Sequence, residues 1–256
     1  MNISVLYLGR IDCKKDYLIQ CSDANQMIKS PISAILIQHP TLGKLLYDTG
    51  NSPFYSTEYP KSTLETYPIT EFISIEDALK QKGLTPADID MIILSHLHFD
   101  HAGGLRYFKG TKAIRNVLVS AAELKTAYYQ VMTGHPGAYV KSLFDLDDIQ
   151  FTAINEYTAL AEDVKLFIQQ SHTPGLIGML LNTETKGNLL VTGDTIYTKE
   201  NFEKELPPGG SINKTTKEFF DNLAVIRKMA ERIDASIIYG HDYEQITLLN
   251  QEGWFH

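Results

Sequence analysis

The amino-acid sequence predicts an α/β domain (α+β in some classifications) in which strands and helices form layers. Short apolar runs rich in Val, Ile and Leu recur along the chain, each bounded by turn residues, as is typical of buried strands. Segments with apolar residues at helical spacing lie between these runs. No repeat, low-complexity tract or linker rich in Pro, Gly and Ser divides the chain. We therefore expect one layered domain over residues 1–256.

The expected strands follow these apolar runs in order. ISVLYL near the amino terminus predicts the first strand. Residues 33–38 and 44–47 flank the turn HPTLG, and residues 179–182 and 188–192 flank TETKG, so each pair predicts a β-hairpin. Further strands are expected in DMIILSH, KAIRNVLVS, VKLFIQQ and ASIIYGHD.

Three helices are expected between the strands. The first covers residues 74–83, where Ser74 supplies the cap and a glycine the stop signal. The others cover residues 120–132 and 216–233, each with one apolar side at helical spacing. Residues 51–70 are rich in Tyr, Ser, Thr and Pro without a period, so we expect a long loop, and long loops inside a compact domain are often functional.

Composition excludes several classes of protein. The hydrophobic content is 43% and the net charge is −8, so we expect a soluble protein whose acidic surface disfavours nucleic acid. The two cysteines, Cys13 and Cys21, are expected to be reduced thiols. The amino terminus lacks the pattern of a signal peptide, and no apolar run approaches the ~20 residues that cross a bilayer. We expect a cytoplasmic protein that does not bind membranes.

The segment SHLHFDHAGG, residues 95–104, concentrates three of the eight histidines of the chain. His96 and His98 are two positions apart, so on an extended chain they point to the same side. Asp100 and His101 follow where the chain leaves the strand, and two glycines permit a tight turn. Imidazole and carboxylate are ligands that zinc and similar divalent ions prefer. The segment therefore predicts a metal site.

Other potential ligands follow apolar strands elsewhere in the chain. His172, Asp194 and His241 each come after such a strand, and so does Asp48. This pattern suits a site at one edge of a sheet. We expect two metal ions: one bound by His96, His98 and His172, the other by Asp100, His101 and His241, with Asp194 as a bridge. The three remaining histidines, His39, His135 and His256, are expected on the solvated surface.

These residues resemble the metallo-β-lactamase superfamily, whose H-x-H-x-D-H motif matches residues 96–101 and whose early strand-end motif matches YDTG at 47–50. Within it, SHLHFDHAGG, GDTIYTKENFE (193–203) and GHDYEQ are similar to motifs of the N-acyl homoserine lactonases, which quench bacterial quorum signals. The resemblance covers nearly the whole chain. It implies an αββα sandwich with a dinuclear site at one edge of its sheets.

The resemblance also implies roles for individual residues. Tyr197 would contact the lactone carbonyl, and Asp100 would carry a proton to the leaving alkoxide. Asp48 would hold a ligand histidine, and Phe99 would line the acyl-chain groove. The cofactor would be two divalent ions, zinc or else iron, manganese or cobalt. The family often has a second histidine in HxPGH, where this chain has Leu176, so contacts near that position are expected to differ.

Several alternatives remain beside a homoserine lactonase that acts as a monomer or homodimer. A lactonase for another small ring, such as a pyridoxine-breakdown lactone, fits the same residues. A β-lactamase is disfavoured because both cysteines precede the metal motif, and a flavodiiron reductase because Glu would replace His98. A hydroxyacylglutathione-type thioesterase and ribonuclease Z would need, respectively, a helical carboxy-terminal domain and a basic surface. A non-enzymatic sensor or scaffold of the same fold usually loses ligands, and none is missing here.

Overall fold

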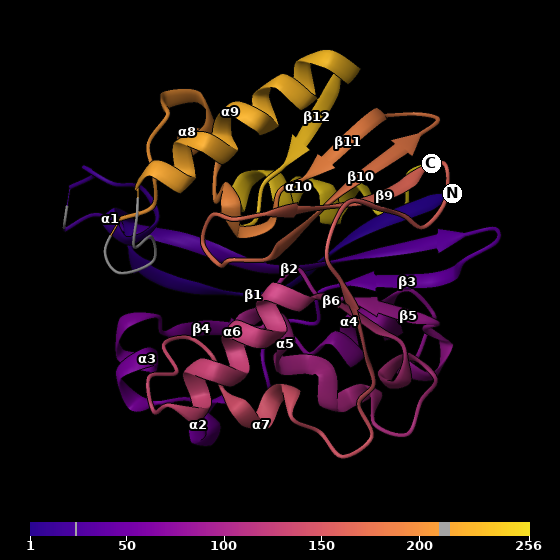
Figure 1. Ribbon diagram of the computed structural model, residues 1–256, viewed down its shortest axis with the longest axis horizontal. Coiled ribbons are helices and arrows are strands. Elements are labelled where there is room, and N and C mark those ends of the chain that lie inside the picture. Colours follow the sequence, from indigo (N-terminus) through magenta and orange to yellow (C-terminus); the bar gives the residue numbers. More distant parts are fainter. Residues whose placement is uncertain (24, 210–215) are drawn as a thin grey trace.

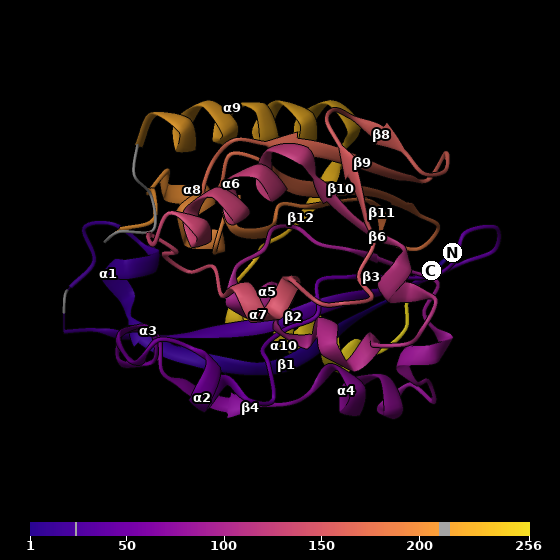
Figure 2. The same ribbon diagram turned by 60° about the horizontal axis from the view of Figure 1, so that its bottom comes forward.

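The computed structural model describes residues 1–23, 25–209 and 216–256. Two β-sheets lie face to face, with helices on their outer sides (Figures 1 and 2). The first sheet has the strand order β4-β1-β2-β3-β5-β6-β7. Its strands are β1 (Asn2–Lys14), β2 (Met27–His39), β3 (Gly43–Tyr47), β4 (Ile69–Phe72), β5 (Met91–Ile93), β6 (Val117–Ser120) and β7 (Phe151–Ile154).

The second sheet has the order β12-β11-β10-β9-β8. Its strands are β8 (Thr158–Ala159), β9 (Val164–Gln169), β10 (Leu176–Thr183), β11 (Gly187–Val191) and β12 (Ala235–Ile238). The α-helices are α1 (Lys15–Leu18), α2 (Tyr55–Glu58), α3 (Lys61–Thr66), α4 (Ile75–Gln81), α5 (Phe99–Ala102), α6 (Ala121–Met132), α7 (Lys141–Phe144), α8 (Lys199–Lys204), α9 (Thr216–Ile233) and α10 (Tyr243–Glu252). Short 3₁₀ helices are η1 (Pro86–Asp88), η2 (Gly103–Phe108), η3 (Ala113–Arg115) and η4 (Gly193–Thr195).

Apolar side chains on both faces of the first sheet explain the layering. Along β2, Ile35 and Ile37 point into the core between the sheets, whereas Leu36 points into a second core that includes residues of α4, α6 and α7. This alternation follows from the two-residue period of a strand. Each face of the sheet is thus covered, by the other sheet on one side and by helices on the other. The αββα sandwich is confirmed.

The predicted hairpins and helices are confirmed. β2 and β3 pair with Gln38 opposite Lys44, and β10 and β11 pair with Met179 opposite Val191. Ser74 caps α4 by accepting a hydrogen bond from the backbone of Asp77. The long helix α9 covers the outer face of the second sheet (Figure 1) and buries Phe219, Leu223 and Ile226 in a third core, as the helical spacing predicts.

The expected loop over residues 51–70 is wrong, because this segment contains the short helices α2 and α3 and the start of β4. Tertiary contacts hold it in place. Glu58 pairs with Arg106 at 2.5 Å, and the hydroxyl of Tyr59 donates to the backbone oxygen of Phe99 at 2.9 Å. The segment therefore packs against the residues of the metal motif and those that follow it.

The prediction for His39 is also wrong, because its side chain is buried at the end of β2. Its Nε2 lies 2.9 Å from the carboxylate of Asp163, and its Nδ1 accepts from the backbone N–H groups of Thr41 and Leu42. The carboxylate and the turn together replace the water that a surface histidine would bind. His135 and His256 are exposed, as expected. Across the residues that the structure describes, no helix has the length and apolar character to span a membrane.

Candidate metal centre

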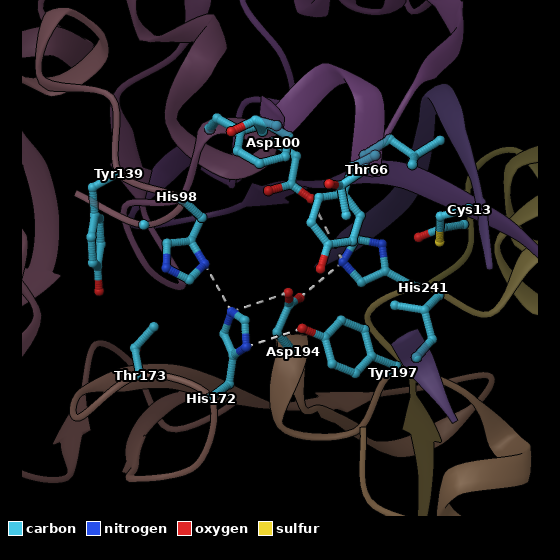
Figure 3. A pocket seen from close by; sticks show the side chains of 18 of the residues that line it. Cys13, Thr66, His98, Asp100, Tyr139, His172, Thr173, Asp194, Tyr197 and His241 are labelled. Atoms are coloured by element: carbon cyan, nitrogen blue, oxygen red, sulfur yellow. Dashed lines mark hydrogen bonds and ion pairs between the residues drawn. The ribbon is translucent and has the colours of Figure 1, made fainter. Parts of the chain in front are cut away.

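The strand ends of both sheets meet at one place. Asp48 directly follows β3, and His96 comes three residues after β5, which runs parallel to β3. Asp194 and His241 come three residues after the parallel strands β11 and β12. His172 lies in the turn between β9 and β10. Figure 3 shows the side chains of His98, Asp100, His172, Asp194 and His241 pointing toward one another.

Three imidazoles converge to form the first cluster. Nε2 of His96 lies 3.0 Å from Nδ1 of His98. Nε2 of His172 lies 3.1 Å from the former atom and 2.9 Å from the latter. Three ring nitrogens this close share too few hydrogens to satisfy one another by hydrogen bonding. A divalent cation would satisfy all three lone pairs at once.

A second cluster contains Asp100, His101 and His241. Oδ2 of Asp100 lies 3.7 Å from Nε2 of His101 and 3.9 Å from Nε2 of His241. The ligand atoms of these three residues lie within 4.8 Å of one another, as do those of the first cluster.

The Asp194 carboxylate lies between the two clusters. Its Oδ1 is 3.3 Å from Nε2 of His101 and 3.1 Å from Nε2 of His241. Its Oδ2 is 3.5 Å from Nε2 of His172 and 3.8 Å from Nε2 of His96. Each oxygen thus faces a different cluster, which is the arrangement of a bridging ligand.

Two buried atoms test whether a cation fits. Nε2 of His101 and Oδ1 of Asp194 have no hydrogen-bond partner among the residues that the structure describes. A buried polar atom without a partner costs about 1–3 kcal/mol, and such atoms call for an explanation. A metal ion that takes both as ligands supplies it. The donor atoms, their burial and their spacing therefore make this a divalent metal site.

Asp48 fixes the His101 ring from behind. Its Oδ2 lies 2.8 Å from Nδ1 of His101, so Nε2 is the nitrogen that faces the cluster. Ser95 donates to the same carboxylate through its backbone N–H and its hydroxyl, both at 2.7 Å. The Ser95 hydroxyl oxygen also lies 2.9 Å from Nδ1 of His96. Two ligand rings, one from each cluster, are thus oriented by one Asp–Ser pair, as outer partners of metal ligands commonly do.

Two other rings are held in the same way. Nδ1 of His241 donates to the backbone oxygen of Pro31 at 2.8 Å. Nδ1 of His172 lies 3.0 Å from the hydroxyl of Tyr197, whose ring stacks on His241 with centroids 5.2 Å apart. Each of these rings therefore presents Nε2 to the metal site.

Burial and charge divide the imidazoles into two groups. Burial lowers the pKa of His96, His98 and His172, to about 4 for His172. Burial also disfavours the charged form of His101 and His241, but nearby carboxylates, above all that of Asp194, outweigh it and raise the pKa of both. The first cluster is therefore neutral at pH 7, the form that binds a metal. The second cluster holds protons more tightly in the metal-free protein.

The site opens into a cavity of about 620 Å³. Tyr197 and Phe99 line it, together with apolar side chains such as Ile11, Leu18 and Tyr67. Leu176 is fully buried at the start of β10 and is not among the side chains that line the cavity.

The sequence did not point to three further residues at the site. Ser95 lies within the metal motif, where its small polar side chain carries no signal of its own. Glu123 lies in α6, and Tyr139 lies in the segment that follows this helix. Both side chains are buried. Ser120 caps α6 by accepting from the backbone of Glu123, a pattern that predicts a helix start but not a buried carboxylate.

Comparisons with known proteins agree with this geometry. A model of the metallo-beta-lactamase superfamily matches residues 28–241. The chain is 28% identical to an N-acyl homoserine lactonase of Bacillus cereus, with 96% of each protein covered. It is 29% identical to N-acyl homoserine lactonase AiiB of Agrobacterium fabrum, over 96% of this chain and 95% of that one.

A solved structure gives the same result in three dimensions. It is an N-acyl homoserine lactone hydrolase with the product N-hexanoyl-L-homoserine bound at its catalytic metal centre. The two folds superpose with a TM-score of 0.80 at 26% identity, over 96% of this chain and 95% of that one. The resemblance drawn from the metal motif is thereby confirmed, and the chain belongs to the metallo-beta-lactamase superfamily.

Proposed function

We propose that this protein hydrolyses the ester bond in the ring of N-acyl homoserine lactones, with two divalent metal ions. The observation that carries the proposal is the position of Asp194 between two three-residue clusters, beside a cavity that also exposes a tyrosine hydroxyl. The named lactonases among its relatives support the substrate class.

In this proposal each cluster holds one ion. His96, His98 and His172 bind the first, and Asp100, His101 and His241 bind the second. Asp194 bridges them. We propose zinc as the metal, because neutral imidazole and carboxylate ligands suit it, with iron, manganese and cobalt as the alternatives.

The bound cations would supply a hydroxide nucleophile at neutral pH and polarise the carbonyl group. The protein supplies the remaining groups. If Nε2 of His172 is a ligand, its Nδ1 carries the hydrogen and donates to the Tyr197 oxygen at 3.0 Å. The Tyr197 hydrogen is then free to donate to the carbonyl oxygen of the substrate as negative charge develops there. In the metal-free protein, burial and the carboxylates of Asp194 and Asp100 raise the pKa of Tyr197 well above that of a free phenol, so its hydroxyl is protonated there.

Asp100 completes the reaction in this proposal. Its side chain lines the cavity, so a carboxylate oxygen can take the proton that the attacking hydroxide brings to the carbonyl carbon and pass it to the alkoxide as the ring C–O bond breaks. Phe99 lies next to it in the cavity wall and would contact the acyl chain. We further propose that residues 1–256 form one domain, that the protein is cytoplasmic, and that it is a monomer or a homodimer.

A panel of substrates tests the proposal. Metal-reconstituted protein is incubated with N-hexanoyl and N-decanoyl homoserine lactone, with simple γ-lactones including a pyridoxine-type lactone, and with a phosphate triester. Chromatography with mass detection should show the ring-opened N-acyl homoserine as the fastest-formed product, and chelated protein should form none. Faster opening of a lactone that lacks the N-acyl group would contradict the substrate class, and full activity after chelation would contradict the metal.

A further inference from the structure

Four of the five imidazoles at the metal site have a fixed partner for the nitrogen that points away from it. His96 contacts Ser95, His101 contacts Asp48, His172 contacts Tyr197 and His241 contacts a backbone oxygen, as the distances above show. His98 is the exception. It presents Nδ1 to the cluster, and its Nε2 makes no hydrogen bond within residues 1–23, 25–209 and 216–256.

The ring of Tyr139 takes the place of such a partner. Its centroid lies 4.6 Å from that of the His98 ring at an interplanar angle of 58°, and Figure 3 shows the two side chains next to each other. The backbones also pair. His98 and Tyr139 form an antiparallel bridge, and the N–H of Phe99 donates to the oxygen of Ala138 at 3.1 Å. The ring therefore has a fixed position against the imidazole.

Glu123 holds the chain that carries His98. Its Oε1 accepts from the backbone N–H of Leu97 at 2.9 Å, directly between the ligand histidines 96 and 98. The side chain is fully buried. A buried carboxyl group on α6 thus fixes the chain between the two histidines, while the Tyr139 ring packs against the second of them.

We propose that Tyr139 and Glu123 are positioning residues that hold the His98 imidazole in its ligating orientation, in place of a hydrogen bond. The inference rests on the proposed role of His98 as a ligand and extends it to two residues outside the proposed ligand set. Tyr139 acts through its ring, and Glu123 acts through the Leu97 backbone.

Tyr128 provides a matched control in the same part of the fold. Its hydroxyl donates to the carboxylate of Asp145 at 3.1 Å, and its ring packs against Phe144 with centroids 5.4 Å apart. Its ring therefore packs in the same region as that of Tyr139, without touching a histidine. Loss of general packing near α6 and α7 should affect Tyr128→Leu and Tyr139→Leu alike.

The test measures metal affinity instead of turnover. Metal-free wild type, Tyr139→Leu, Tyr139→Phe and Tyr128→Leu are titrated with Zn²⁺ against a chelator, and folding is followed by thermal unfolding. Tyr139→Leu should weaken one zinc equivalent by about 10- to 100-fold, the usual range for losing a partner of a ligating histidine. Tyr139→Phe keeps the ring and should bind within about threefold of wild type, since ring packing is the larger part of the contact. Equal affinities for Tyr139→Leu and wild type, or equal losses for Tyr139→Leu and Tyr128→Leu, would overturn the proposal.

Two further measurements separate this inference from the proposed function. Glu123→Ala should weaken the same zinc equivalent, and Glu123→Gln should restore it, because an amide oxygen still accepts from Leu97. In the metal-free protein, the ring ¹⁵N resonances of His98 should shift or broaden in Tyr139→Leu while those of His241 stay unchanged. An unchanged His98 signal refutes the positioning role even if the protein is a lactonase. A wild type that binds none of Zn²⁺, Fe²⁺, Mn²⁺ and Co²⁺ refutes the proposed function, while the His98 signal still decides the role of Tyr139.

Discussion

The contact between Asp48 and His101 gives the sharpest prediction. In Asp48→Asn, one carboxylate oxygen becomes an NH₂ group, while the other can still accept from Ser95. The NH₂ group would face Nδ1 of His101, now 2.8 Å from a carboxylate oxygen, and it can donate but not accept. The imidazole must then carry its proton on Nε2, which blocks the nitrogen that faces the metal site.

The expected size of the effect follows from the partners that are lost. Removing the outer partner of a ligating histidine costs about 10- to 100-fold in metal affinity, or about 1.4–2.8 kcal/mol. The backbone should not move, because Asp48 has a left-handed φ of 62° and asparagine tolerates this region as well as aspartate does. The loss should therefore appear in the affinity for the metal held by His101 and not in the fold.

Chelator competition with Zn²⁺ measures this affinity, and thermal unfolding of the metal-free protein checks the fold. Asp163→Asn is the matched control, because Asp163 holds His39 at 2.9 Å through the same carboxylate–imidazole contact, outside both clusters. The control should bind both equivalents like wild type. If Asp48→Asn also binds both equivalents within about threefold of wild type, Asp48 does not set the tautomer of His101. The inference from the carboxylate–imidazole contact at this ring is then wrong.

Two other predictions concern the metal site, and a third concerns the two cysteines. With metal kept saturating, Tyr197→Phe should lower kcat by about 10- to 1,000-fold, the effect of one oxyanion donor, and an unchanged kcat would remove Tyr197 from the reaction. Carboxylates outweigh burial and raise the pKa of His101, so protons should displace metal from its cluster first as the pH falls. Burial lowers the pKa of His172 to about 4, so its cluster should lose metal last. Stepwise dialysis from pH 8 to pH 4 with metal analysis should show two separate losses, and a single joint loss would contradict this. Burial raises the pKa of the Cys13 thiol to about 12, whereas Cys21 is exposed, so a thiol reagent at pH 8 should label Cys21 quickly and Cys13 only after denaturation.

The convergence of these His and Asp side chains was predictable because its signals are local. Each donor follows an apolar run, and a run of this kind ends where the strand leaves the core. Parallel pairing then brings the ends together, β3 with β5 and β11 with β12. The sequence could thus place His96, Asp194 and His241 at one edge from strand ends alone, and the spacing of the metal motif supplied the rest.

The residues that the sequence did not identify depend on contacts between distant segments. Glu123 lies in the first turn of a capped helix, where a carboxylate usually faces water. It is buried because the chain from His96 to His98 crosses that turn and needs an acceptor for the N–H of Leu97. The buried His39 ring contacts the carboxylate of a residue 124 positions away. Neither partner leaves a mark in the local pattern.

The helices in residues 51–70 show a different limit. α2 has four residues and α3 has six, well below the ~12–15 residues at which an isolated helix becomes stable. Such helices need no apolar period of their own, because the pairing of Glu58 with Arg106 and the Tyr59 hydroxyl hold them against the rest of the fold. A search for helical periodicity therefore sees only a loop.

The positions of the strand ends could be predicted, but the directions of the side chains that follow them could not. Backbone conformation at the site explains this difference. Five non-glycine residues have a left-handed φ in the part of the chain that the structure describes. Three of them, Cys21, Glu205 and Asp234, are exposed. The other two are Asp48, with φ 62°, and His172, with φ 70°. A left-handed backbone costs an L-residue roughly 1–2 kcal/mol, although Asp and His tolerate it better than most residues.

At both positions the left-handed backbone allows specific side-chain contacts. The turn at Asp48 directs its carboxylate to His101 and Ser95, and the turn at His172 directs Nε2 toward His96 and His98. An extended backbone at either residue would instead stand the side chain roughly perpendicular to its sheet. The strain is therefore held by the contacts that the turn creates, and these contacts join both sheets. Because a strained turn of this kind is stable only when its distant partners are in place, no local pattern could have predicted it.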